Sequence, residues 1–147
     1  MRDSIVGRKM EKAELEKIFN SAKAEFLAVC GRRRVGKTFL IKEYFEKELV
    51  FSVSGLAKAN TQKQIKNFYS TLKLYDSSLT EKPNDWLDAF NLLIKYLTSL
   101  SQERKVILLD ELPWLDTPRS GCIAALEHPW NGWASPRRGT ALIVCGS

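Results

Sequence analysis

The stretch from Gly31 to Thr38 reads GRRRVGKT, and it decides the fold of this 147-residue chain. The apolar run Phe26 to Cys30 leads directly into it, and an unbroken run of this kind is typical of a strand covered on both faces. The segment that follows, Thr38 to Lys47, has the apolar spacing of a helix. The sequence therefore predicts a strand, a glycine-rich loop and a helix in direct succession.

A loop with glycines at these positions is typical of phosphate binding. Gly31 and Gly36 let the backbone curve so that successive N–H groups point at an anion, and the N-terminus of the next helix adds its positive end. Lys37 would bridge the β- and γ-phosphates of a nucleotide, while the Thr38 hydroxyl would bind magnesium. We therefore expect a Walker A loop that binds ATP with Mg2+, consisting of Gly31, Arg32, Arg33, Arg34, Val35, Gly36, Lys37, Thr38 and Phe39.

The three consecutive arginines of this loop contribute their backbone N–H groups, and we expect their side chains to point into solvent. They could instead contact nucleic acid or a neighbouring subunit, although nothing else in the sequence supports nucleic-acid binding. The net charge of +6 favours polyanions in general. However, lysines and glutamates alternate in Lys9 to Lys17 and in Lys42 to Glu48, as they do on solvated helix faces.

A second motif follows Lys105, where an apolar run ends in Asp110 and Glu111. This is the Walker B pattern, which delivers two adjacent carboxylates to the edge of a parallel sheet where ligands bind. We expect Asp110 to hold Mg2+, through water, and Glu111 to polarise the attacking water as a general base. An acidic pair also ends ordinary solvated strands, and it is the phosphate loop earlier in the chain that favours the catalytic interpretation.

The last apolar run ends in Cys145, Gly146 and Ser147. If this strand lies between the other two, Ser147 would sense the γ-phosphate. The alternative is a serine that merely ends a strand.

These motifs belong to a chain in which short β-rich runs alternate with helical segments, which predicts one α/β domain, residues 1–147, built on a mostly parallel sheet. Residues 54–60 and 75–85 are rich in turn formers and predict loops. The apolar runs that predict strands are Phe26 to Cys30, Leu49 to Val53, Val106 to Leu109 and Ala141 to Cys145. Apolar stripes predict helices over residues 10–22, 38–47, 65–72 and 86–100.

Three widely spaced cysteines, Cys30, Cys122 and Cys145, form no CxxC pair and are expected to be buried thiols. This favours a reducing, cytoplasmic location. The N-terminus has no signal-peptide pattern, and no apolar run approaches the 18 residues or so needed to cross a membrane.

Taken together, the chain resembles the prokaryotic and archaeal ATPases of the AAA+/STAND group over its whole length. IVGR at Ile5 to Arg8 is similar to that family's N-terminal box, and LIVCGS to its sensor strand. DELPWLD at Asp110 to Asp116 and HPWNGW at His128 to Trp133 are more specific than the Walker A loop.

The resemblance implies a P-loop NTPase three-layer sandwich in which the first strand lies beside the fourth, then the third, then the second. It would place Val6, Gly7 and Arg8 near the adenine. Trp114, Trp130 and Trp133 would pack around the segment after Walker B rather than stack on a base, and His128 would be structural.

The resemblance stops at the sensor serine, so the predicted sheet is truncated after the fourth strand, without the family's fifth strand, helical lid and C-terminal regions. The first strand is then an exposed edge.

We expect either an ATPase or a nucleotide-dependent switch or scaffold with little turnover. A small-molecule kinase is the third hypothesis. A protein partner or self-association fits both leading hypotheses. Arg137 and Arg138, which precede the fourth strand, are the only candidates for an arginine finger.

Overall fold

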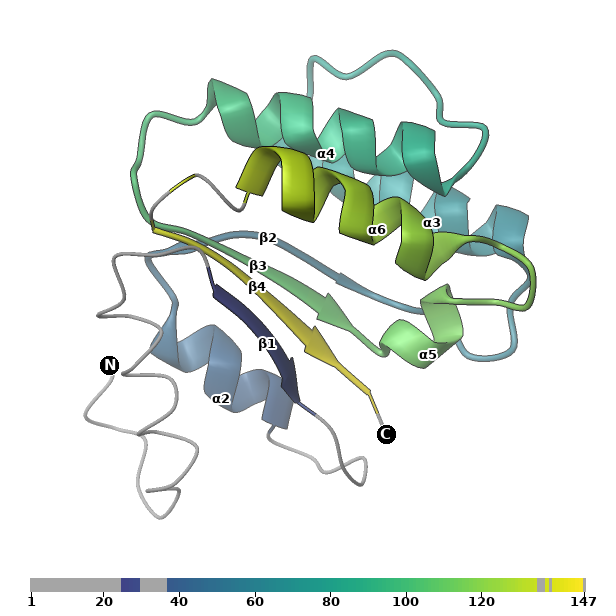
Figure 1. The fold of residues 1–147 in the computed structure, drawn as a ribbon, viewed down its shortest axis with the longest axis horizontal. Helices are drawn as coiled ribbons and strands as arrows, with labels where there is room; N and C mark the ends of the chain where they lie inside the picture. Colours follow the sequence, from purple (N-terminus) through teal and green to yellow (C-terminus); the bar gives the residue numbers. More distant parts are fainter. Residues whose placement is uncertain (1–24, 30–36, 135–136, 138, 147) are drawn as a thin grey trace.

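A computed structural model describes residues 25–29, 37–134, 137 and 139–146, with the backbone alone for residues 25–29 and 37–40. Its four strands form one sheet in the order β1-β4-β3-β2, and every neighbouring pair is parallel (Figure 1). This confirms the strand order that the family resemblance implied, including the place of the fourth strand between the first and third. The strands are β1 (Glu25–Val29), β2 (Leu49–Ser54), β3 (Lys105–Asp110) and β4 (Thr140–Cys145), each within one residue of its predicted bounds.

Helices cover both faces of the sheet, as the prediction of a three-layer α/β fold requires. One helix, α2, lies on one face, while α3, α4 and α6 lie on the other (Figure 1). The described helices are α2 (Lys37–Tyr44), α3 (Thr61–Tyr75), α4 (Trp86–Ser99), α5 (Leu112–Leu115) and α6 (Cys122–Pro129), followed by a π-helical turn, η2 (Trp130–Ala134). The helix predicted over residues 10–22 lies outside the described residues.

Local hydrogen bonds explain where these helices begin and end. The Asn60 side chain caps α3 by accepting the Lys63 N–H, and Asp85 caps α4 in the same way. Helix α2 ends at Tyr44, three residues before the predicted end, because the chain turns there. The Phe45 carbonyl accepts the N–H groups of the residues three and four positions later, and this turn delivers the chain into β2.

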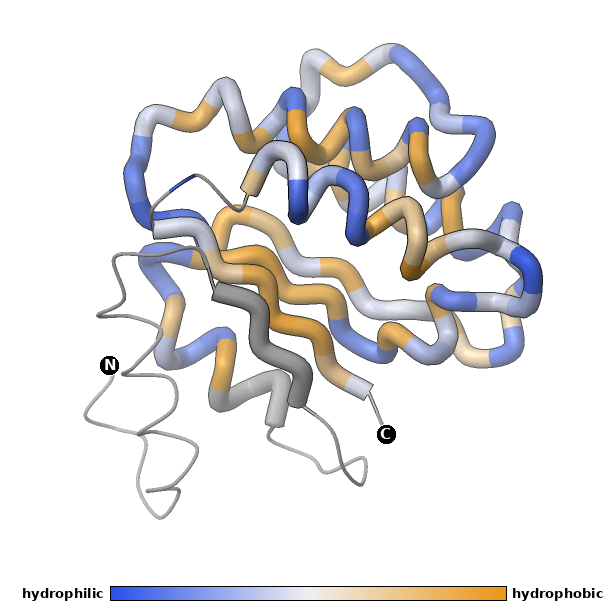
Figure 2. Tube along the Cα trace, in the orientation of Figure 1, coloured by the Kyte–Doolittle hydropathy of each residue, from blue (hydrophilic) through white to orange (hydrophobic). Residues whose placement is uncertain are grey.

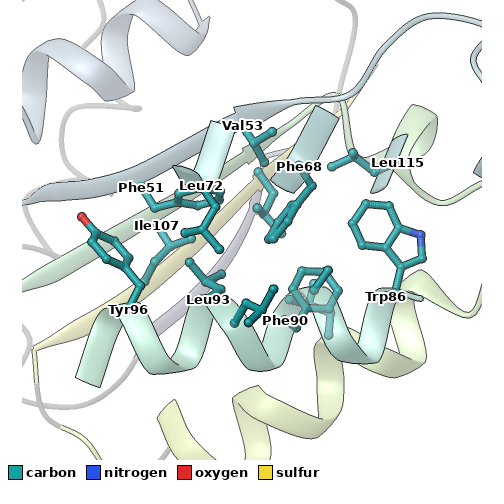
Figure 3. Close-up of a cluster of buried hydrophobic side chains, with 14 of the residues drawn as sticks. Phe51, Val53, Phe68, Leu72, Trp86, Phe90, Leu93, Tyr96, Ile107 and Leu115 are labelled. Carbon is teal, nitrogen blue, oxygen red and sulfur yellow. The ribbon is translucent and has the colours of Figure 1, made fainter. Parts of the chain in front are cut away.

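The core has two parts, one on each face of the sheet. Along β3, Val106 and Leu108 pack on the α2 side, whereas Ile107 and Leu109 pack on the side of α3, α4 and α6. Figure 2 shows the continuous apolar colouring of the central strands that results from burial on both faces. Large aromatic side chains, Phe51, Phe68, Trp86 and Phe90, fill the space between the sheet and α3 and α4 (Figure 3).

The short helices between β3 and β4 have no counterpart among the predicted elements. Helix α5 has four residues, and a segment that short cannot show a helical period. Helix α6 ends in Pro129 and passes directly into η2. Within the described residues, no helix combines the length and hydropathy that crossing a bilayer requires.

Candidate functional site

The carboxyl ends of β1, β4 and β3 meet at one edge of the sheet (Figure 1). Val29 pairs with Cys145 and Leu109 pairs with Val144, so Asp110 stands level with Cys145. Only β4 separates Asp110 from the end of β1, and two strand spacings amount to about 10 Å. Ligands bind at this edge in parallel α/β sheets, so the topology brings both predicted motifs to one candidate site.

In the sequence, the predicted phosphate loop connects β1, which ends at this edge, to α2. Residues 30–36 lie outside the described residues, and α2 begins at Lys37, one residue before the predicted start. The first turn of α2 therefore contains Lys37, Thr38 and Phe39, for which the structure describes the backbone. The succession of strand, connection and helix is confirmed, and the contacts of this loop with phosphate stay a prediction.

Two further predicted site residues, Arg8 and Ser147, also lie outside the described residues. The strand before Ser147 is β4, which does lie between β1 and β3 as the sensor interpretation required. The position of the strand is thus confirmed, and the role of the serine stays a prediction.

Asp110 lies on the face of the sheet that α2 covers. Side chains alternate along a strand, and Asp110 has the same parity in β3 as Val106 and Leu108, which pack on the α2 side. Its Oδ1 accepts the Glu111 N–H at 2.9 Å, and its carbonyl oxygen accepts the Gly55 N–H at 2.9 Å. The carboxylate is therefore on the face of the sheet along which α2 runs from the end of the phosphate loop.

Glu111 combines burial with an unusual backbone. The residue is 8% exposed, and its φ of 55° and ψ of 44° place it in the left-handed region, which non-glycine residues rarely adopt. Its carbonyl accepts the Trp114 N–H at 2.9 Å, so this conformation starts α5. Left-handed non-glycine residues cost roughly 1–3 kcal/mol and cluster at functional sites. The geometry thus singles out Glu111 as a buried acidic residue in a left-handed turn directly after β3.

Helix α5 holds this acidic turn against the rest of the molecule. Leu115 is 1% exposed in the core between the sheet and α3 and α4. Pro113 approaches the end of β4 so closely that a Cβ on Gly146 would lie 2.7 Å from its Cδ. The Thr117 hydroxyl, just after α5, is hydrogen-bonded to that of Thr61 at the start of α3. The acidic turn is therefore tied to both β4 and α3.

Sequence reasoning missed two residues that support the turn from the β2–α3 connection. Gly55 follows β2, and a Cβ there would lie 2.6 Å from the Glu111 carbonyl oxygen. Gln64 is fully buried in α3 and hydrogen-bonds through its side chain to the backbones of Leu56 and Ala59. A glycine directly after a strand indicates a close backbone approach and could have identified Gly55, whereas no sequence signal distinguishes Gln64 from its exposed neighbours.

The tryptophans after Walker B are divided between two places. Trp114 lies on α5, whereas Trp130 and Trp133 pack against the core beside α4. The Trp133 Nε1 donates to the Thr98 hydroxyl at 3.0 Å, and the Arg137 guanidinium lies over the Trp133 ring. Trp130 and Trp133 belong to the segment that follows Walker B and pack against the core, which agrees with the structural role expected of them.

Arg137 lies just before β4, at the amino edge of the sheet and opposite the edge that carries Asp110. The length of β4 separates it from the candidate site, so it does not serve as a finger within this chain. Arg138 lies outside the described residues.

The other reactive side chains fit structural roles. Cys122 is fully buried, and burial together with the nearby Asp116 raises the pKa of its thiol from 9.0 to about 12. Such a thiol stays protonated and unreactive at neutral pH. Cys145 is also buried, which confirms the expectation for both cysteines, while Cys30 lies outside the described residues. His128 is exposed in the last turn of α6.

The parallel sheet, its two helical layers and the arrangement of motifs at its carboxyl edge define the fold of a P-loop NTPase. A family model described as "AAA domain" matches residues 21–147, and the chain belongs to this family. A relative in Methanocaldococcus jannaschii, named as an uncharacterized ATP-binding protein, is 47% identical over 45 residues. That match covers 31% of this chain and 76% of the relative.

Proposed function

We propose that this chain is a STAND-type ATPase domain that binds ATP with Mg2+ through Gly31 to Thr38 and hydrolyses it. One observation carries the proposal: Asp110 ends β3 with the same parity as Val106 and Leu108, which pack on the α2 side, and β4 alone lies between β3 and β1. The Walker A sequence spans the connection between β1 and α2. The name of the archaeal relative supports ATP as the nucleotide, and DELPWLD and HPWNGW support the STAND-type assignment.

The donor set suits Mg2+ in a nucleotide site. Among the described residues, no group of three or more His, Cys, Asp and Glu side chains could form a protein-only metal cage. Magnesium in nucleotide sites takes one or two protein oxygens besides phosphate and water, so the Thr38 hydroxyl and the Asp110 carboxylate would suffice. When bound, the ion would neutralise charge on the β- and γ-phosphates.

The residues of the chain would divide the remaining work. The backbone N–H groups of the loop and the Lys37 ammonium would hold the phosphates. Glu111 would orient a water molecule and accept its proton as the oxygen attacks the γ-phosphate. Burial of this residue at the start of α5 supports the role, since a shielded carboxylate is held in one place and little water competes for it. Ser147 would contact the γ-phosphate from the end of β4.

A nucleotide-dependent switch with little turnover is the second candidate. Helix α5 begins at the acidic turn, buries Leu115 in the core and is followed by the Thr117–Thr61 hydrogen bond to α3. A change of conformation at Glu111 on nucleotide binding would therefore be transmitted to α3. The switch hypothesis needs this coupling and does not need hydrolysis.

Nucleotide binding and phosphate release distinguish the two candidates. We expect Lys37→Ala to weaken ATP binding roughly 10- to 100-fold, because it removes a charge-assisted contact with phosphate. We expect Glu111→Gln to keep ATP binding and to lower phosphate release by roughly 10²- to 10⁴-fold, the usual contribution of a general base. Labelled-ATP titration with Mg2+ and a phosphate-release assay measure the two quantities.

Matched variants control for charge and fold. Lys42→Ala removes an exposed lysine from the same helix, and Glu127→Gln neutralises an exposed glutamate on α6. Neither should change binding or turnover. Equal ATP affinity in wild type and Lys37→Ala would refute the nucleotide site, and tight binding without phosphate release in wild type would favour the switch over the ATPase.

Cys122, a buried free thiol, supports a reducing and therefore cytoplasmic setting.

A further inference from the structure

A groove of about 800 Å³ runs along the outer face of α3, and none of its lining residues belongs to the candidate nucleotide site. We call it the α3 groove. Helix α3 lines it with a stripe at helical spacing that includes Lys66, Tyr69, Lys73 and Leu74, and the α3–α4 connection adds Lys82 and Pro83. Lys66 and Lys73 lie two turns apart on α3, about 10 Å along the helix axis.

The α3 groove is positively charged. Three of its ten described lining residues are lysines, and none of the ten is acidic. The acidic side chains closest in sequence are engaged elsewhere. Asp76 accepts the backbone N–H and the hydroxyl of Ser78, and Glu81 pairs with Lys95 at 3.2 Å. The lysines of the groove therefore present a charge that no lining residue balances.

The same groove also exposes apolar side chains. Leu74 is 87% exposed, more than any other large apolar side chain in the described part of the chain. Tyr69 packs one side against the core while it lines the groove, and Pro83 is half-buried beside it. A groove that combines an exposed aliphatic anchor with three lysines matches a ligand that is both apolar and acidic.

We propose that the α3 groove binds an acidic amphipathic helix of a partner protein. Carboxylates on that helix would lie opposite Lys66, Lys73 and Lys82, and its apolar stripe would cover Leu74 and Tyr69. Nucleic acid would engage the lysines and leave Leu74 unmatched, with Tyr69 as the one aromatic ring in the groove for a base to stack on. Because Leu74 and Tyr69 make part of the groove apolar, an amphipathic peptide helix fits it better than nucleic acid does.

The probe is a fluorescently labelled synthetic helix with leucines along one face and glutamates on the other, titrated with the full chain and followed by anisotropy. We expect saturable binding that Leu74→Ala weakens roughly tenfold or more, because the leucine would be buried on binding. We expect the double variant Lys66→Glu/Lys73→Glu to weaken binding further at low salt and to lose most of the salt dependence.

Lys42→Glu is the matched control, because it reverses an exposed lysine on α2, across the sheet from the groove. It should bind the probe as wild type does. Circular dichroism establishes that each variant is folded, and Leu74→Ala removes a side chain that contributes little to the core.

Four results would overturn the proposal. They are no saturable binding of the probe, equal binding by wild type and both groove variants, equal binding of a probe with lysines in place of glutamates, and tighter binding of a single-stranded oligonucleotide of equal charge than of the probe. A fifth result, a dimer that Leu74→Ala dissociates, would also overturn it and would assign the groove to a second copy of the chain.

Discussion

The conformation of Glu111 depends on a neighbour that has no side chain. Gly55 donates its N–H to the Asp110 carbonyl, and a Cβ at this position would lie 2.6 Å from the Glu111 carbonyl oxygen and 2.9 Å from the Trp114 Cβ. The first of these atoms belongs to the backbone, which cannot move aside alone. Only glycine allows the β2–α3 connection to lie this close to the acidic turn.

We therefore expect Gly55→Ala to destabilise the fold by about 1–3 kcal/mol, the usual cost of overpacking. If Glu111 serves hydrolysis, phosphate release should fall as well, because the turn that orients it must shift. Urea denaturation measures the first effect and the phosphate assay the second.

Gly132→Ala is the control for this substitution, since a Cβ there meets no atom within 4 Å. It should leave stability unchanged or raise it slightly. Equal stability of the two alanine variants would show that the close approach of Gly55 is not required.

At the scale of elements, the connection between β2 and α3 is held by one buried amide. The Gln64 side chain accepts the Leu56 N–H at 2.9 Å and donates to the carbonyls of Leu56 and Ala59. Gln64 is fully buried, and both polar groups of its side-chain amide are hydrogen-bonded to the backbone of the β2–α3 connection. The apolar stripe of α3 predicts the helix and does not reveal this polar anchor.

Replacing Gln64 with alanine should cost about 1–3 kcal/mol, because the backbone groups of Leu56 and Ala59 lose their partners. The loss should appear as a lower denaturant midpoint and as faster hydrogen exchange in residues 56–59. Gln62→Ala removes an exposed glutamine from the same helix and should change stability by no more than about 0.5 kcal/mol. A midpoint for Gln64→Ala equal to that of Gln62→Ala would contradict the anchoring role.

For the molecule as a whole, stability depends on covering both faces of a parallel sheet. Leu108 and Leu109 are adjacent in β3 and both fully buried, yet they belong to different cores, one against α2 and the other against α3 and α4. A sheet covered on only one face would expose one of the two.

We expect Leu108→Ala and Leu109→Ala each to lower the free energy of unfolding by about 2–5 kcal/mol, since each leaves a cavity in a packed layer. Leu74→Ala makes the same chemical change at an 87% exposed position and should stay within about 0.5 kcal/mol of wild type. Thermal or urea unfolding of the three variants tests this. A near-neutral Leu108→Ala would mean that α2 does not cover its face of the sheet.

Much of this architecture could be predicted because its signals are local. Each strand is an unbroken apolar run, and each long helix in the described part carries a visible stripe, so their bounds were predicted to within a few residues. Helix α5 and the π-helical turn η2 escaped prediction because four or five residues cannot show a period. Arg137 could be placed only by the structure, which puts it at the opposite edge of the sheet.

By itself, the sequence determined the α/β class, the strands and the two motifs expected to bind nucleotide, because apolar periodicity and glycine spacing are properties of neighbouring residues. The family resemblance added the strand order. Only the tertiary structure decided that Asp110 shares a face with α2, that Glu111 is buried in a left-handed turn, and that Gly55 and Gln64 support it. Such relations depend on backbone packing between segments far apart in the chain. A glycine directly after a strand indicates a close approach at Gly55, but no local pattern of residues says which segment approaches it.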